Sequence, residues 1–248
     1  MTAEQFKKAI TPKTKCLILN TPNNPTGAVY SETEINAIAQ IAEENGIYVI
    51  SDEIYEKLVY GGEKHYSIAQ YSEKMKELTV IINGMSKTYA MTGWRIGYLA
   101  APLSIAKAIS SMQSHTTSNA CSISQYASVT ALVDAKGEEF IKQMQKTFDE
   151  RRCLMIEMLS SVKGIECIEP KGAFYVFVNV KGLYGKSFEG TAINDSLTFA
   201  DCALKKGVAL IPGVAFGSDD CIRLSYAISI DDIKEGLNRL ISFINELK

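Results

Sequence analysis

The chain has 248 residues, of which 46% are apolar and 22% charged, and its formal net charge is −2. These proportions are ordinary for a globular protein, and a net charge this small creates no overall field that would attract nucleic acid or an anionic membrane. No apolar run is long enough to span a bilayer, and the N-terminus lacks the apolar stretch of a secretory signal. We therefore expect a cytoplasmic protein of one or two domains that binds neither nucleic acid nor membrane.

Short apolar segments alternate with amphipathic ones in the first part of the chain, which is typical of an α/β fold with a mostly parallel sheet. Ser31 and Glu34 have the spacing of a capping box, and Gly46 is placed to end the helix that this box begins. The expected elements are a strand at 16–20, a helix at 31–45, strands at 47–51, 79–82 and 96–101, mostly helix over 103–133 and a long helix over 138–161.

After the long helix the pattern changes to strands mixed with shorter helices, which is typical of a small α+β domain. We therefore predict two domains, covering residues 1–150 and 151–248. The expected elements of the second domain are strands at 173–180, 208–211 and 221–227 and helices at 194–206 and 231–246.

The six cysteines are scattered and form no CxxC pair, so we predict neither a metal site nor a disulfide framework. We interpret them as small buried apolar side chains.

Polar clusters follow the ends of several expected strands, where ligands bind in open α/β sheets. Asn24 lies in the loop NTPNNPTG (20–27), which is either a plain connection or a rigid support that orients an amide. Asp52 ends an apolar strand, and its carboxylate is either a helix N-cap or the partner of a cationic ring nitrogen.

Three cations stand in apolar surroundings. Lys87 follows a strand, where a desolvated amine would be a nucleophile able to form a Schiff base. Arg95 lies between Gly93 and Gly97, which suits a phosphate-binding turn. Arg223 lies within an apolar strand and forms either a structural ion pair or a clamp on a substrate carboxylate.

Together these groups match the needs of pyridoxal 5′-phosphate: an amine for its aldehyde, a cation for its phosphate, an acid at its pyridine nitrogen and donors at its phenolic oxygen. At this point the sequence resembles the aspartate aminotransferase family, the class I and II aminotransferases of pyridoxal-phosphate fold type I. The motifs that carry the resemblance are GMSKTYAMTGWRIG (84–97), PNNPTG (22–27), SDEIY (51–55), GAFYV (172–176) and IRLSYA (222–227).

The resemblance implies a role for each matching residue. Lys87 carries the cofactor and moves a proton during catalysis, Asp52 pairs with the pyridine nitrogen, and Arg95 binds the phosphate. Asn24 and Tyr55 bind the phenolic oxygen, and Arg223 grips the substrate carboxylate with help from Asn24. Some family members have a phosphate-binding serine where this chain has Gly84. Gly84 has no hydroxyl to make that contact, and Ser86 is the candidate for it instead.

The resemblance also implies amino-group transfer between an L-amino acid and a 2-oxo acid in a homodimeric parent enzyme. The chain resembles the C-terminal portion of such an enzyme, because family members have a long segment before the NPTG loop. Aspartate, alanine and aromatic amino acids all remain open as donors. The competing interpretations are a carbon–sulfur β-lyase of the same fold and a non-catalytic cofactor-binding remnant.

Overall fold

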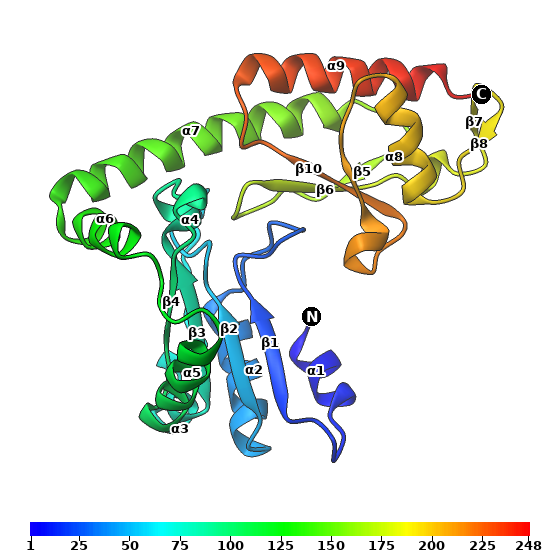
Figure 1. Cartoon of the computed structure of the whole chain (residues 1–248). Helices are drawn as coiled ribbons and strands as arrows, with labels where there is room; N and C mark the ends of the chain where they lie inside the picture. Colours follow the sequence, from blue (N-terminus) through cyan, green and yellow to red (C-terminus); the bar gives the residue numbers. More distant parts are fainter. The chain divides into compact units, whose positions relative to one another are not determined.

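The computed structural model describes all 248 residues, which form two compact units (Figure 1). Unit 1 comprises Met1–Pro22 and Val29–Gln143, and unit 2 comprises Asn23–Ala28 and Met144–Lys248. The division falls inside helix α7 (Ala135–Ser160), and the short loop Asn23–Ala28 belongs to unit 2. The domain boundaries expected from the sequence, 1–150 and 151–248, stay a prediction.

Unit 1 contains four strands and the helices that accompany them. Its elements are α1 (Ala3–Ala9), β1 (Cys16–Asn20), α2 (Glu32–Glu44), β2 (Tyr48–Asp52), η1 (Ile68–Gln70), α3 (Glu73–Glu77), β3 (Thr79–Gly84), α4 (Met85–Thr88), η2 (Thr92–Trp94), β4 (Gly97–Ala100), α5 (Leu103–Thr116), α6 (Ser122–Val133) and the first part of α7.

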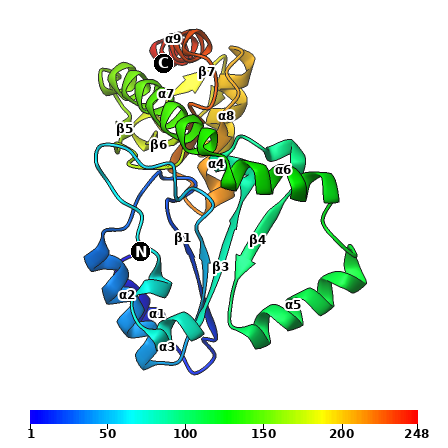
Figure 2. The same ribbon diagram turned by 90° about the vertical axis from the view of Figure 1, so that its left-hand side faces the viewer.

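The sheet of unit 1 has the strand order β1-β2-β3-β4, in which the first three strands are parallel and β4 is antiparallel. Helices α1, α2 and α3 lie together on one side of this sheet, as Figure 2 shows. The Ser31 and Glu34 capping box starts α2 as expected. The buried core on the covered side contains Phe6, Leu19, Ile35, Ile38, Ala39, Ala42, Ile47, Val49, Ile68 and Met75.

Unit 2 is built around an antiparallel sheet, as expected for an α+β domain, with strand order β5-β6-β10-β9. Helices α7 and α9 lie on one side of this sheet (Figure 1). Its elements after α7 are β5 (Glu166–Cys167), β6 (Tyr175–Asn179), η3 (Lys181–Leu183), β7 (Ser187–Phe188), β8 (Thr191–Ala192), α8 (Ser196–Lys205), β9 (Ile211–Pro212), η4 (Gly213–Phe216), β10 (Cys221–Ser225) and α9 (Ile230–Glu246).

The expected α/β fold class is confirmed, but some details differ. Helix α1 was not expected from the sequence. Phe6 is its only buried residue, so no repeating apolar pattern marks it as a helix. Of the strand expected at 208–211, only the last residue is in β9. The interpretation of the cysteines as buried is wrong for five of the six, because only Cys202 is buried and the others lie on open or half-covered faces. No helix combines the length and the apolar character needed to cross a membrane.

Gly27 holds the loop of residues 23–28 against the rest of unit 2. Its carbonyl accepts hydrogen bonds from the amides of Lys171 (2.9 Å) and Gly172 (2.8 Å). Its φ is +68°, and a Cβ added there would lie 2.3 Å from Pro170 Cβ. Gly27→Ala therefore combines left-handed strain with a steric clash, and we expect a loss of about 2–4 kcal/mol in the free energy of unfolding.

Urea denaturation measures this loss, and Gly190→Ala is the matched control. Gly190 also has a positive φ, +81°, but a Cβ there meets nothing within 4 Å. The control carries strain alone, about 1–2 kcal/mol. Equal losses in the two variants would contradict the packing argument.

Candidate active site

The predicted residues of unit 1 gather where the parallel strands end. In the sheet register Asn20 of β1 lies beside Asp52 of β2, and Asp52 lies beside Ile82 of β3. The antiparallel strand β4 starts at the same edge, because Gly97 pairs with Gly84. Asp52, Lys87 and Arg95 thus come from neighbouring strand ends, although they are up to 43 residues apart in the sequence by subtraction of their numbers. This is the edge at which open α/β sheets bind ligands.

Asp52 is partly buried and sits at the end of β2. Its Oδ1 accepts a hydrogen bond from the backbone N–H of Ile54 at 3.2 Å. No helix begins there, so the interpretation of Asp52 as a helix N-cap is wrong, and the contact is a local side-chain turn. Burial raises the pKa of the Asp52 carboxyl, the bond from Ile54 lowers it, and the negative charge of Glu53 raises it further.

Lys87 and Tyr55 lie close together. Lys87 belongs to α4, which directly continues β3, and its Nζ is 5.9 Å from the centroid of the Tyr55 ring. Tyr55 is buried, whereas Lys87 is only partly buried rather than enclosed as its apolar flanks indicated. An amine next to a phenol at a strand end can exchange protons with a bound ligand.

Arg95 lies at the surface of unit 1 with a φ of +52°. Its Nη1 donates to the carbonyl of Thr92 at 2.8 Å, and it forms no ion pair with an acidic side chain. The apolar residues around it do not bury it, because β4 is an edge strand with mostly exposed residues. A guanidinium without a carboxylate partner is available to an external anion.

The backbones around Gly84 approach closely. A Cβ at Gly84 would lie 3.0 Å from Gly97 Cα and 3.1 Å from the carbonyl oxygen of Ile96. This crowding disfavours a serine at Gly84, the position at which some family members bind phosphate. Ser86 is partly buried within α4 and stays a candidate for that contact.

The two predicted residues of unit 2 form a pair. Arg223 of β10 donates from Nη1 to Asn24 Oδ1 at 2.8 Å, across 199 residues of sequence. The guanidinium carbon lies 4.4 Å from the Tyr175 ring centroid and 5.0 Å from that of Phe216. Arg223 forms no ion pair, so the structural salt bridge considered for it is absent. Its remaining donors can bind an anion in a forked geometry.

Two groups around these residues were not expected from the sequence. Tyr175 lies in the GAFYV motif, but nothing in its spacing indicates that its ring contacts Arg223. The second group is His65, whose Nε2 lies 2.9 Å from Oε2 of the buried Glu53. The loop between Glu53 and His65 brings their side chains together, and the spacing of apolar residues in the sequence does not predict the path of a loop.

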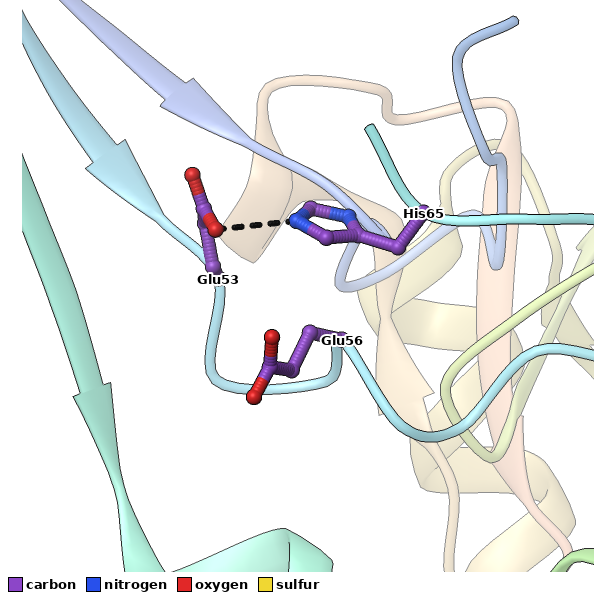
Figure 3. A group of neighbouring side chains, drawn as sticks. All are labelled: Glu53, Glu56 and His65. Atoms are coloured by element: carbon purple, nitrogen blue, oxygen red, sulfur yellow. Dashed lines mark hydrogen bonds and ion pairs between the residues drawn. The ribbon is translucent and has the colours of Figure 1, made fainter. Parts of the chain in front are cut away.

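Glu53, Glu56 and His65 are the only group whose spacing could hold a metal ion, with ligand atoms within 4.8 Å of one another (Figure 3). They line a cavity of about 860 Å³ that includes neither Asp52 nor Lys87. Both Glu53 oxygens, however, already accept hydrogen bonds from protein donors. The group is therefore better explained as a hydrogen-bonded network than as a metal centre.

Comparison with known proteins identifies the family. The sequence pattern of the family "Aminotransferase class I and II" matches residues 1–240. The chain belongs to the class I and II aminotransferases.

Relatives and solved structures agree with this family. The chain is 44% identical over 244 residues to an aspartate aminotransferase of Geobacillus stearothermophilus, covering 98% of this chain and 61% of the relative. It is 40% identical to an asparagine–oxo-acid transaminase of Streptococcus mutans, covering 99% and 61%. The crystal structure of an aspartate aminotransferase from Rhizobium meliloti matches with a TM-score of 0.95 at 38% identity, covering 100% and 62%. The chain thus spans about three fifths of the length of these relatives.

Enzymes of this family generally depend on pyridoxal phosphate, and the residues of unit 1 fit that group. The donor set contains one amine (Lys87), one partly buried carboxylate (Asp52), one buried phenol (Tyr55) and one guanidinium without an acidic partner (Arg95). These are the four kinds of group that the amine, pyridine, phenol and phosphate chemistry of the cofactor requires.

Proposed function

We propose that this chain is a pyridoxal-phosphate-dependent aminotransferase chain that transfers an amino group between an L-amino acid and a 2-oxo acid. The observation that carries the proposal is the gathering of Asp52, Tyr55 and Lys87 at the carboxyl edge of the parallel strands, with Lys87 Nζ 5.9 Å from the Tyr55 ring. The bound cofactor supplies an electron sink that stabilises negative charge at the substrate Cα.

The protein residues provide binding, orientation and proton transfer. Asp52 holds a positive charge at the ring nitrogen, because its carboxylate is hydrogen-bonded and only partly solvated. Tyr55 donates its phenol proton to an oxygen of the ligand, and its burial keeps the ring in place. Lys87 would hold the cofactor through its amine, and once the amine of the substrate has displaced it, the released Lys87 Nζ would carry a proton as a general base. Arg95 neutralises the phosphate.

The pair in unit 2 provides the anion contact of the substrate. Arg223 uses one Nη1 bond on Asn24, which fixes the plane of the guanidinium and leaves its other donors for a carboxylate. The names of similar proteins include aspartate, asparagine–oxo-acid and aromatic aminotransferases, so the fold alone does not define the side-chain preference.

Cofactor titration tests the proposal. Addition of pyridoxal phosphate to the chain is expected to produce the visible absorbance of a lysine adduct, and borohydride reduction followed by peptide mapping is expected to place the label on Lys87. Lys87→Ala removes both signals, whereas Lys107→Ala, a change in helix α5, is the matched control and retains them. A wild-type chain that gives neither absorbance nor label contradicts the proposal.

A further inference from the structure

Glu53 is a buried carboxylate to which the proposed chemistry assigns no role. The residue is 3% exposed. Its Oε1 accepts hydrogen bonds from Ser51 Oγ at 2.9 Å and from Ser67 Oγ at 2.6 Å, and its Oε2 contacts His65 Nε2 at 2.9 Å. A buried carboxylate costs folding free energy unless such donors satisfy it. Ser51 belongs to β2 itself, whereas His65 and Ser67 join the end of β2 to a loop segment 12 to 14 residues further along the chain.

The backbone of Glu53 links this network to the residues proposed to bind the cofactor. Its N–H donates to the carbonyl of Ile82 at 2.9 Å, which continues the β2–β3 ladder past Asp52. Its carbonyl accepts from the N–H of Glu56 at 2.9 Å, which closes the turn that contains Tyr55. Successive residues of a strand point to opposite faces, so Ser51 and Glu53 are held on the face opposite to Asp52.

We propose that the buried Glu53 network is a positioning device that holds the Asp52 carboxylate and the Tyr55 turn in the geometry needed for the cofactor. This inference rests on the proposed function, because it extends the role of the same edge. Glu53 touches no reacting atom in this scheme and acts only through its neighbours. Hydrogen bonds that hold the side chains on one face of the strand also fix its backbone. The backbone in turn sets the direction of the side chain on the other face.

Glu56 provides a control for the effect of charge. It lies in the same cluster, but Figure 3 shows Glu53 and His65 joined to each other and Glu56 joined to neither. The charges that shift the pKa of Asp52 include Glu53 and do not include Glu56. Glu56→Gln therefore removes one negative charge from the cluster and leaves the network intact.

Two variants remove a network contact without touching Glu53, namely Ser67→Ala and His65→Phe. Both are expected to weaken pyridoxal phosphate binding roughly tenfold, the effect of losing one hydrogen bond to a charged group. In the chain without cofactor, carbon-13 NMR titration is expected to show the pKa of Asp52 falling toward its ordinary value, because a released carboxyl is better hydrated. Glu56→Gln leaves the cofactor affinity and the Asp52 pKa unchanged.

A purely structural role predicts a different result. Ser67→Ala and His65→Phe would then lower the thermal midpoint while cofactor affinity and the Asp52 pKa stayed as in wild type, and this outcome overturns the proposal. A wild-type chain that binds no cofactor contradicts the proposed function alone, since the titration of Asp52 in the cofactor-free chain still decides whether the network positions that carboxylate.

Discussion

Asp52→Asn is expected to abolish most of the cofactor-dependent activity and, at the same time, to make the folded chain more stable. Asparagine has the shape of aspartate and keeps an oxygen that can accept the hydrogen bond from the Ile54 N–H. Asparagine carries no charge, however, so it cannot stabilise the protonated form of the pyridine nitrogen. Truncating one partner of a hydrogen-bonded charge pair costs about 2–5 kcal/mol, so turnover should fall by about 10² to 10³-fold.

The stability gain follows from the raised pKa of Asp52. Burial disfavours the ionised carboxyl in the folded chain, so the folded state binds the proton more tightly than the unfolded state does. Ionised Asp52 therefore opposes folding at pH values above its folded pKa, and this cost disappears as the pH falls through that value. The gain is under about 1 kcal/mol, since the group is half exposed and solvent screens it.

Urea denaturation of both proteins as a function of pH measures this effect. The stability difference between Asp52→Asn and wild type should be largest at neutral pH and should vanish in acid, where both side chains are neutral. Transaminase assays at neutral pH measure the activity loss. A variant that loses stability at neutral pH together with activity would show that Asp52 has a structural role instead.

The regular part of the fold could be predicted because it follows from local patterns. The capping box at Ser31 and the apolar stretches of β1, β2 and β3 are encoded within a few consecutive residues. Helix α1 and the two-residue strands of unit 2 could not be predicted, because tertiary contacts rather than periodicity define them. The antiparallel direction of β4 likewise depends on the chain reversal through η2.

The proposed site shows the same division between local and long-range information. Lys87 and Asp52 could be identified because a charged residue at the end of an apolar strand is unusual. The bond between Asn24 and Arg223 joins residues 199 positions apart, and only the resemblance to a family suggested that they act together. The Glu53–His65 contact was missed, since a buried carboxylate can be recognised only when its donors are known.

Arg223→Lys keeps the positive charge, but it is nevertheless expected to weaken substrate binding strongly. Lysine is a point charge without the planar fork, and it cannot reproduce both the 2.8 Å bond to Asn24 and a two-point contact with a carboxylate. It also loses the flat contact with the rings of Tyr175 and Phe216, which lie 4.4 and 5.0 Å from the guanidinium carbon. The loss of about 2 kcal/mol corresponds to a KM about 30-fold higher for the amino acid.

The comparison of KM with cofactor affinity separates this role from a general structural defect. Arg223→Lys should change pyridoxal phosphate binding far less than substrate binding, because the cofactor contacts proposed in unit 1 do not involve Arg223 and the only cofactor-binding candidate bonded to it is Asn24. The matched control is Arg239→Lys, a change at an exposed arginine of α9 that pairs with Glu235 and donates to the carbonyl of Gly207. Calorimetry with an unreactive dicarboxylate gives the same comparison without turnover. An unchanged dicarboxylate affinity in Arg223→Lys would assign the substrate carboxylate to another residue and leave Arg223 as the stacking partner of Tyr175 and Phe216.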